Sequence, residues 1–116
     1  MEKQQTARPD HRARDYVSDA LSDLGIHYIF GVPGTNEIPI IDGTSYPENG
    51  VRYIEGLHEN IAIGADIGSA RMTGKPGVLV VHVTPGIAHS IGTCSMPAAR
   101  QCRWSFFAYS NIPSIF

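Results

Sequence analysis

The sequence of 116 residues lacks the features that would direct a protein to a membrane or to nucleic acid. It has no apolar run as long as a membrane-spanning helix, which needs about 20 residues, and we expect no secretory signal in its polar N-terminal segment. The net charge is only -2, and acidic and basic residues are mixed along the chain. Because no basic patch is present, nucleic-acid binding is not indicated, and we expect neither a membrane nor a nucleic acid as partner.

Cysteine is also scarce. The two cysteines, Cys94 and Cys102, do not have the spacing of metal ligands, and two thiols are too few for the disulfide framework of a small secreted domain. We therefore predict free thiols, a cytoplasmic location, and no metal ligand among the chain's own residues.

The composition is that of a folded protein, since 42% of the residues are hydrophobic and the length suits one small domain. We predict a flexible tail over residues 1–11 and a single domain over 12–116. Apolar periodicity and short apolar runs predict an alternation of helices and strands. Helices are expected over 12–24, 37–41, 58–72 and from 87 to 92 and beyond, strands over 26–32, 51–55 and 78–83, and a further strand is possible over 103–109.

This alternation predicts an α/β fold, a doubly wound and mostly parallel sheet with flanking helices. The helix over 58–72 contains many small residues and almost no charge, so we expect it to be buried in a core or in an interface. Its Gly64 and Gly68 lower helix propensity and are expected to let another backbone come close. Glu59 begins this helix just beyond a strand, where it is either a site residue or an acid that complements the helix N-terminus.

Polar or glycine-rich turns follow each of the three strands. Because the carboxyl ends of parallel strands meet at one edge of the sheet, Thr35, Glu59 and His82 could converge there. Each has a plainer interpretation as well. Thr35, or Asn36, could cap the next helix, with Glu37 in its first turn, and His82 could be hydrogen-bonded to the backbone.

Three segments resemble one family. Residues 28–39 (YIFGVPGTNEIP) are similar to its "FGxPGxxxxP" turn, His58-Glu59 begins a helix like its "HE…A…A.GYAR" helix, and residues 74–77 (GKPG) lead into a strand as its members do. The chain resembles the N-terminal, pyrimidine-binding domain of thiamine diphosphate-dependent decarboxylases and synthases, most closely the benzoylformate decarboxylase and acetolactate synthase group.

The resemblance implies thiamine diphosphate as cofactor and a 2-oxo acid as substrate, with a leaning towards an aryl or short-chain acid. In such enzymes the residue at the Glu59 position hydrogen-bonds N1′ of the aminopyrimidine and so promotes loss of the C2 proton of the thiazolium. Pro33 and Gly34 match the turn beside the pyrimidine, Thr35 matches a hydroxyl residue facing the substrate, and His82 matches a histidine that handles protons. We expect burial against apolar neighbours to raise the pKa of Glu59.

The chain also departs from the family pattern. The Gly-Asp-Gly stretch and the following Asn that hold Mg²⁺ and the diphosphate are absent, so Mg²⁺ is expected only through a domain that this chain lacks. The partner implied is a diphosphate-binding domain, on another chain or in a missing segment, within a homo-oligomeric full-length enzyme. The resemblance fades after Gly92, Pro97 interrupts the next helix, and His89 stands where relatives usually carry an amide.

These departures predict a truncated or frame-slipped piece of a longer enzyme, inactive and self-associating when isolated. Two alternatives remain open at this point. The chain could be the pyrimidine-domain subunit of a two-chain decarboxylase, or a non-catalytic remnant that docks on full-length relatives. A Rossmann-type nucleotide binder is disfavoured, because no Gly-x-Gly-x-x-Gly turn follows a strand.

Overall fold

The computed structural model describes residues 12–45, 50–95 and 104–109, in which helices and strands alternate. The predicted tail, Pro97 and Cys102 lie outside these residues. The four strands of the described chain form one parallel sheet in the order β2-β1-β3-β4. In chain order the elements are α1 (Ala13–Asp23), β1 (Tyr28–Gly31), α2 (Ile38–Gly43), β2 (Arg52–Glu55), α3 (Glu59–Thr73), β3 (Gly77–His82), α4 (Val83–Cys94) and β4 (Trp104–Tyr109).

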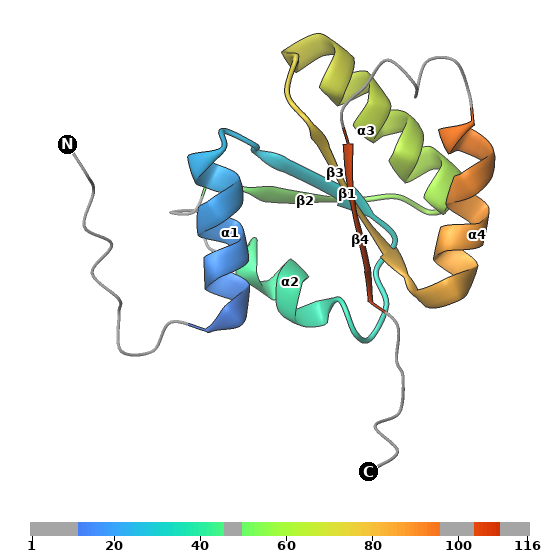
Figure 1. Cartoon of the computed structure of the whole chain (residues 1–116). Coiled ribbons are helices and arrows are strands. Elements are labelled where there is room, and N and C mark those ends of the chain that lie inside the picture. The colour runs from blue at the N-terminus through green and yellow to red at the C-terminus, as the bar shows by residue number, and fades with distance from the viewer. Residues whose placement is uncertain (1–11, 46–49, 96–103, 110–116) are drawn as a thin grey trace.

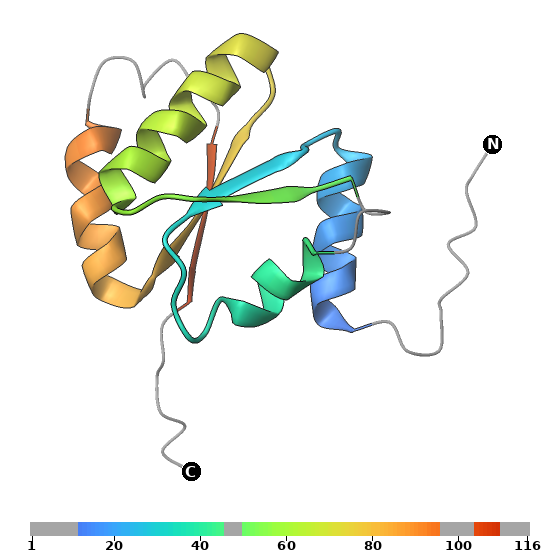
Figure 2. The same cartoon turned by 180° about the vertical axis from the view of Figure 1, so that it is seen from behind.

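The helices cover both faces of the sheet, with α1 and α2 on one face and α3 and α4 on the other (Figures 1 and 2). After β1 the chain adds β2 on one side, and it then crosses back over β1 to add β3 on the other. The winding direction therefore reverses between β1 and β3, which is the switch point where open α/β sheets bind ligands. The predicted doubly wound α/β fold is confirmed.

Strand β3 is the centre of the core because its side chains point alternately to the two faces. Val78 and Val80 pack with residues of α1 and β1, whereas Leu79 and Val81 pack with residues of α3 and β1. All four are buried. This explains the continuous apolar run in the sequence, since a central parallel strand needs apolar side chains on both faces.

Two helix starts differ from expectation. Helix α2 has Glu37 as its N-cap residue, so the prediction that Thr35 or Asn36 caps it is wrong. Helix α4 begins at Val83, earlier than expected, and Pro85 lies in its first turn, where a missing backbone N–H costs nothing. Val83 has a positive φ of 42°, which strains a β-branched residue directly beside the carboxyl end of β3.

Helix α3 is buried on one side only. The backbone N–H of Asn60 donates to Nδ1 of the N-cap residue His58 at 3.2 Å, and Gly74 ends the helix with a left-handed φ of 70°. The buried side carries Ala62, Ile63, Asp66 and Ala70, while Ile61 and Met72 on the other side are exposed.

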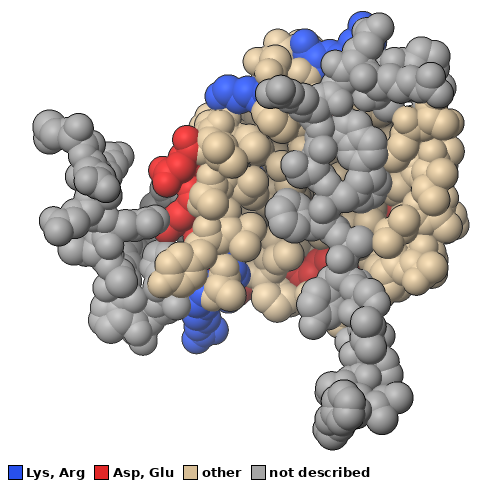
Figure 3. Space-filling view, viewed as in Figure 1, with Lys and Arg blue, Asp and Glu red and all other residues tan. Residues whose placement is uncertain are grey.

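The expected burial in a core therefore holds for one side of α3 only. No atom of the described residues would lie within 4 Å of a Cβ at Gly64 or Gly68, so the close backbone approach expected at these glycines is also not present within the chain. Burial of this side in an interface stays a prediction. In the view of Figure 3, blue and red side chains of the described segments are scattered among uncharged ones without forming a large patch of one sign. None of the described helices combines the length and apolar character needed to cross a membrane.

Candidate functional site

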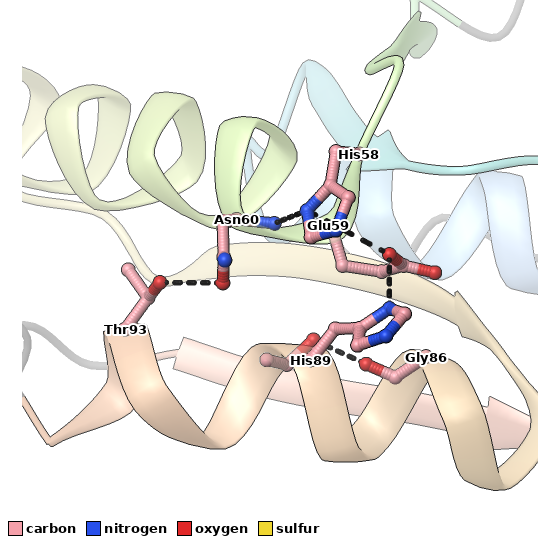
Figure 4. Close-up of polar contacts among 7 residues, drawn as sticks. His58, Glu59, Asn60, Gly86, His89 and Thr93 are labelled. Carbon is pink, nitrogen blue, oxygen red and sulfur yellow. Dashed lines mark hydrogen bonds and ion pairs between the residues drawn. The ribbon is translucent and has the colours of Figure 1, made fainter.

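Glu59 lies at the beginning of α3, where the chain has just left the carboxyl end of β2. Its Oε2 accepts a hydrogen bond from Nδ1 of His89 on α4 at 3.0 Å, and Nδ1 of His58 lies 4.0 Å from the same oxygen (Figure 4). The Glu59 side chain is only 12% exposed, while the ring of His89 is 52% exposed. One carboxylate is thus held between two imidazoles that water can reach.

The ionisation of Glu59 differs from the expectation. Burial raises its pKa, but the hydrogen bond from its own backbone N–H, the hydrogen bond from His89, and the positive charge that His89 and His58 carry when protonated lower it. The net result is a pKa below the ordinary value for glutamate. The predicted increase is wrong because the backbone hydrogen bond and the two imidazoles together outweigh the effect of burial.

His82 belongs to a second glutamate–histidine pair. Its Nδ1 donates to Oε2 of Glu37 at 2.9 Å, and the Glu37 side chain is 1% exposed while His82 is 35% exposed. A Cβ at Gly34 would lie 2.6 Å from Glu37 Oε2 and would clash with His82 Nδ1. Glycine is therefore required at position 34, because the pair packs directly on its backbone.

The structure brings some of the sequence-predicted site residues together and leaves others apart. Gly34 and His82 are in contact, as expected from strand ends that share an edge. Thr35 and Pro33 are exposed on the turn after β1. No hydrogen bond or ion pair in the described part of the chain joins Glu59 to His82 or to Thr35.

A further hydrogen bond joins α3 to α4 beside Glu59, because Thr93 Oγ1 donates to Oδ1 of Asn60 at 2.8 Å (Figure 4). Within α4, Ser90 Oγ donates to the carbonyl of Gly86 at 2.7 Å. Gly86 itself faces Glu59, since a Cβ there would lie 3.4 Å from Oε1. One oxygen of Glu59 is therefore held by His89, and the other lies beside a residue that has no side chain.

Sequence reasoning missed the two partners of these carboxylates. His89 was noted only as a departure from the family pattern, and Glu37 only as a charge in a helix first turn. The sequence contains one indication for His89, because it lies one helical turn after Gly86 and so shares a face of the helix with it. That this face meets Glu59 depends on the packing of α4 against α3.

The strand order and the position of the site define an α/β domain of the flavodoxin-like winding class, with functional groups at the carboxyl edge of the sheet. The sequence model of the family described as "Thiamine pyrophosphate enzyme, N-terminal TPP binding domain" matches residues 11–101. The chain therefore belongs to this family, whose cofactor, thiamine pyrophosphate, is the same compound as thiamine diphosphate.

Individual relatives agree with this assignment. Benzoylformate decarboxylase of Pseudomonas aeruginosa is 37% identical over 68 residues, which cover 59% of this chain and 12% of that protein. Acetolactate synthase of Bacillus subtilis is 31% identical over 87 residues, which cover 75% of this chain and 15% of that protein. The structure of a thiamine diphosphate-dependent 4-hydroxybenzoylformate decarboxylase from Rhodococcus jostii RHA1 superposes with a TM-score of 0.68 at 26% identity, covering 84% of this chain and 18% of that one.

The chain thus spans less than one fifth of the length of these relatives. The family match runs to residue 101, beyond Gly92, where the resemblance of the motifs is expected to fade.

Proposed function

We propose that this chain binds the aminopyrimidine part of thiamine diphosphate, as the N-terminal portion of a 2-oxo acid decarboxylase or an acetolactate synthase-like enzyme. The observation that carries the proposal is the placement of the Glu59 carboxylate. It begins α3 beside the carboxyl edge of the sheet, and its Oε1 lies next to Gly86, where no side chain covers it.

The residues around Glu59 fit the pyrimidine ring. A carboxylate with a lowered pKa is a hydrogen-bond acceptor near neutral pH, and such an acceptor suits a ring nitrogen that carries a proton. The chain has no Gly-Asp-Gly stretch, so a diphosphate and its Mg²⁺ would be held by a domain outside this sequence. The chain's own share of the cofactor is the pyrimidine half.

Each residue at this edge then has a role. Glu59 accepts the hydrogen bond of the ring nitrogen and exchanges its proton, while Pro33 and Gly34 shape the turn beside the ring. His82 moves protons near the substrate and is oriented by Glu37, and the exposed hydroxyl of Thr35 contacts the substrate. When bound, thiamine diphosphate supplies an electron sink for cleavage or formation of the bond next to a 2-oxo group. We propose an aryl or short-chain 2-oxo acid as substrate.

Thiamine binding to the whole chain tests the proposal by nuclear magnetic resonance. With ¹⁵N-labelled protein, EDTA and millimolar thiamine, we expect the backbone amide signals of Glu59 and Gly86 to shift. The shifts should vanish in Glu59→Gln and persist in the control Glu55→Gln, which changes an exposed carboxylate on β2. Shifts that are absent from the wild type, or unchanged in Glu59→Gln, would overturn the proposal.

A second candidate is a subunit that completes its site with a separate diphosphate-binding chain, or a module that docks on full-length relatives. It is favoured by the exposed apolar side chains Leu57, Ile61 and Met72 on and beside α3. The same spectra examine it, because titration with a diphosphate-binding domain of a relative should broaden the signals of these three residues. Unchanged signals would argue against docking through α3.

A further inference from the structure

The histidines beside Glu59 come from different parts of the chain and meet at one point. His58 is the N-cap residue of α3, Glu59 is its first residue, and His89 reaches across from α4 (Figure 4). One ligating atom from each of the three side chains can be chosen so that all lie within 4.8 Å of one another. The rings of His58 and His89 are stacked, with centroids 4.9 Å apart and an interplanar angle of 26°.

We propose that His58, Glu59 and His89 bind a divalent transition-metal ion of the zinc type. Two imidazoles and one carboxylate are one of the donor sets that hold Zn²⁺ when a protein supplies three ligands, and the fourth tetrahedral position is then open to water. Hard ions such as Mg²⁺ and Ca²⁺ prefer an all-oxygen set. The donor set therefore selects zinc and its neighbours and rejects the ion that the family uses with its diphosphate.

Two of the three ligand separations are close to those of a metal site, and the stacked rings of His58 and His89 must turn towards a common point. Zinc lies about 2.0 to 2.2 Å from nitrogen and oxygen ligands, so a tetrahedral site separates ligand atoms by roughly 3.4 Å. Glu59 Oε2 is 3.0 Å from His89 Nδ1 and 4.0 Å from His58 Nδ1. Both rings are about half exposed, so they can rotate to close the remaining difference.

The protons also balance. In the structure Nδ1 of His89 donates to Glu59, and for metal binding this proton moves to Nε2 of the same ring, so that Nδ1 can bind the ion. Nδ1 of His58 already accepts from the N–H of Asn60, so it is unprotonated, and a metal ion competes with that N–H or takes Nε2. The Asn60–Thr93 hydrogen bond holds the two helices that carry the ligands.

The charge around the cluster is favourable on balance. A helix N-terminus disfavours a cation by about 0.3 to 1 kcal/mol, but the Glu59 carboxylate lies at the same point. Helix α4, which supplies His89, carries no lysine or arginine that would repel the ion. We expect micromolar affinity, because two of the three ligands are solvent-exposed.

Titration of the full chain with Zn²⁺ by calorimetry at pH 7.5, in a Cys94→Ser/Cys102→Ser background that removes thiol ligands, tests the proposal. We expect one bound ion per chain, with affinity reduced at least tenfold in His89→Asn and in His58→Asn. Both substitutions keep the local hydrogen bonds, because the amide in His58→Asn can still cap α3 and the amide in His89→Asn can still donate to Glu59. His27→Asn changes an exposed histidine bonded to the carbonyl of Gly50 and should leave the affinity unchanged.

Imidazole ¹⁵N spectra of the unsubstituted chain provide a second measurement that does not depend on folding of a variant. Zn²⁺ should shift the ring signals of His58 and His89 and leave those of His27 and His82 in place. Binding that is equally strong in His89→Asn, or ring signals that do not move with Zn²⁺, would overturn the proposal. The test is independent of the proposed function, because the thiamine experiment is done in EDTA and this one without thiamine.

Discussion

Two glutamate–histidine pairs lie at the carboxyl edge of this sheet, and they differ chiefly in burial. In both, a histidine Nδ1 donates to a carboxylate oxygen, at 2.9 Å for His82–Glu37 and 3.0 Å for His89–Glu59. Glu37 is completely enclosed and packs with His82 on the backbone of Gly34. The Glu59 pair opens to water through two half-exposed imidazoles.

The difference in burial distinguishes a tightly held pair, His82–Glu37, from a pair that can exchange its partner, His89–Glu59. A buried carboxylate that loses its partner keeps the full cost of desolvation, so such a pair is held together tightly. A pair that water can reach is easily replaced, since solvent takes the place of the lost partner. We therefore infer that Glu37 holds His82 in a fixed orientation at the edge of the sheet, while the Glu59 pair is the one that can exchange its partner for a ligand.

The largest expected effect tests this difference directly. Glu37→Ala should reduce the free energy of unfolding by about 3 kcal/mol, because it removes one partner of a buried pair and leaves a gap beneath His82. Glu59→Ala should cost about 1 kcal/mol or less, since His89 and His58 become hydrated and only the favourable charge at the helix N-terminus is lost. Urea unfolding followed by circular dichroism measures both. Equal losses in the two variants would remove the distinction between the pairs.

A third carboxylate, Asp66 on α3, sharpens the comparison because it is buried without a histidine. Burial raises its pKa to about 6, although a hydrogen bond from the Val78 backbone N–H opposes the increase, and its Oδ1 has no hydrogen-bond partner. The folded-state pKa lies above the ordinary value of 3.8, so the stabilising contribution is complete below about pH 4 and is lost as pH rises towards 6.

The loss amounts to about 2 kcal/mol between these two pH values. Asp66→Asn should remove this part of the pH dependence, because the amide stays neutral and can still accept from Val78. Unfolding free energies measured at several pH values for the wild type, Asp66→Asn and the control Asp23→Asn, an exposed position on α1, provide the check. A pH profile that Asp66→Asn leaves unchanged would contradict this assignment.

The same three carboxylates show what the sequence could and could not predict. The element order followed from apolar patterns, which also placed Glu59 at the start of a helix, a short turn after a strand. Its pKa was predicted in the wrong direction, since the direction depends on His89, 30 residues away. The burial of the Glu37 and Asp66 side chains depends on packing between elements, which cannot be predicted from the periodicity of a single segment. The sequence left open whether α3 is buried in a core or in an interface, because small and apolar residues do not show whether their partner belongs to the same chain.

Substitution of the glycine next to each pair is expected to have the smallest effect on stability. Each substitution adds one methyl group beside a pair, so the two variants compare how tightly the two pairs are packed. Gly34→Ala places a Cβ against His82 Nδ1 and 2.6 Å from Glu37 Oε2, so the pair must shift, and we expect a loss of about 1 to 2 kcal/mol in the free energy of unfolding. Gly86→Ala places a Cβ 3.1 Å from the Cβ of Val81 and 3.4 Å from Glu59 Oε1. The crowding there is mild, and it is offset by a gain in helix propensity of about 1 kcal/mol.

We therefore expect Gly86→Ala to be nearly neutral in urea unfolding. The ring ¹⁵N signals of His82 should move in Gly34→Ala and stay in place in Gly86→Ala, because only the first substitution touches that ring. If Gly86→Ala were the more destabilising of the two, the Glu59 pair would be the tightly packed one, and the assignment of the two pairs would have to be exchanged.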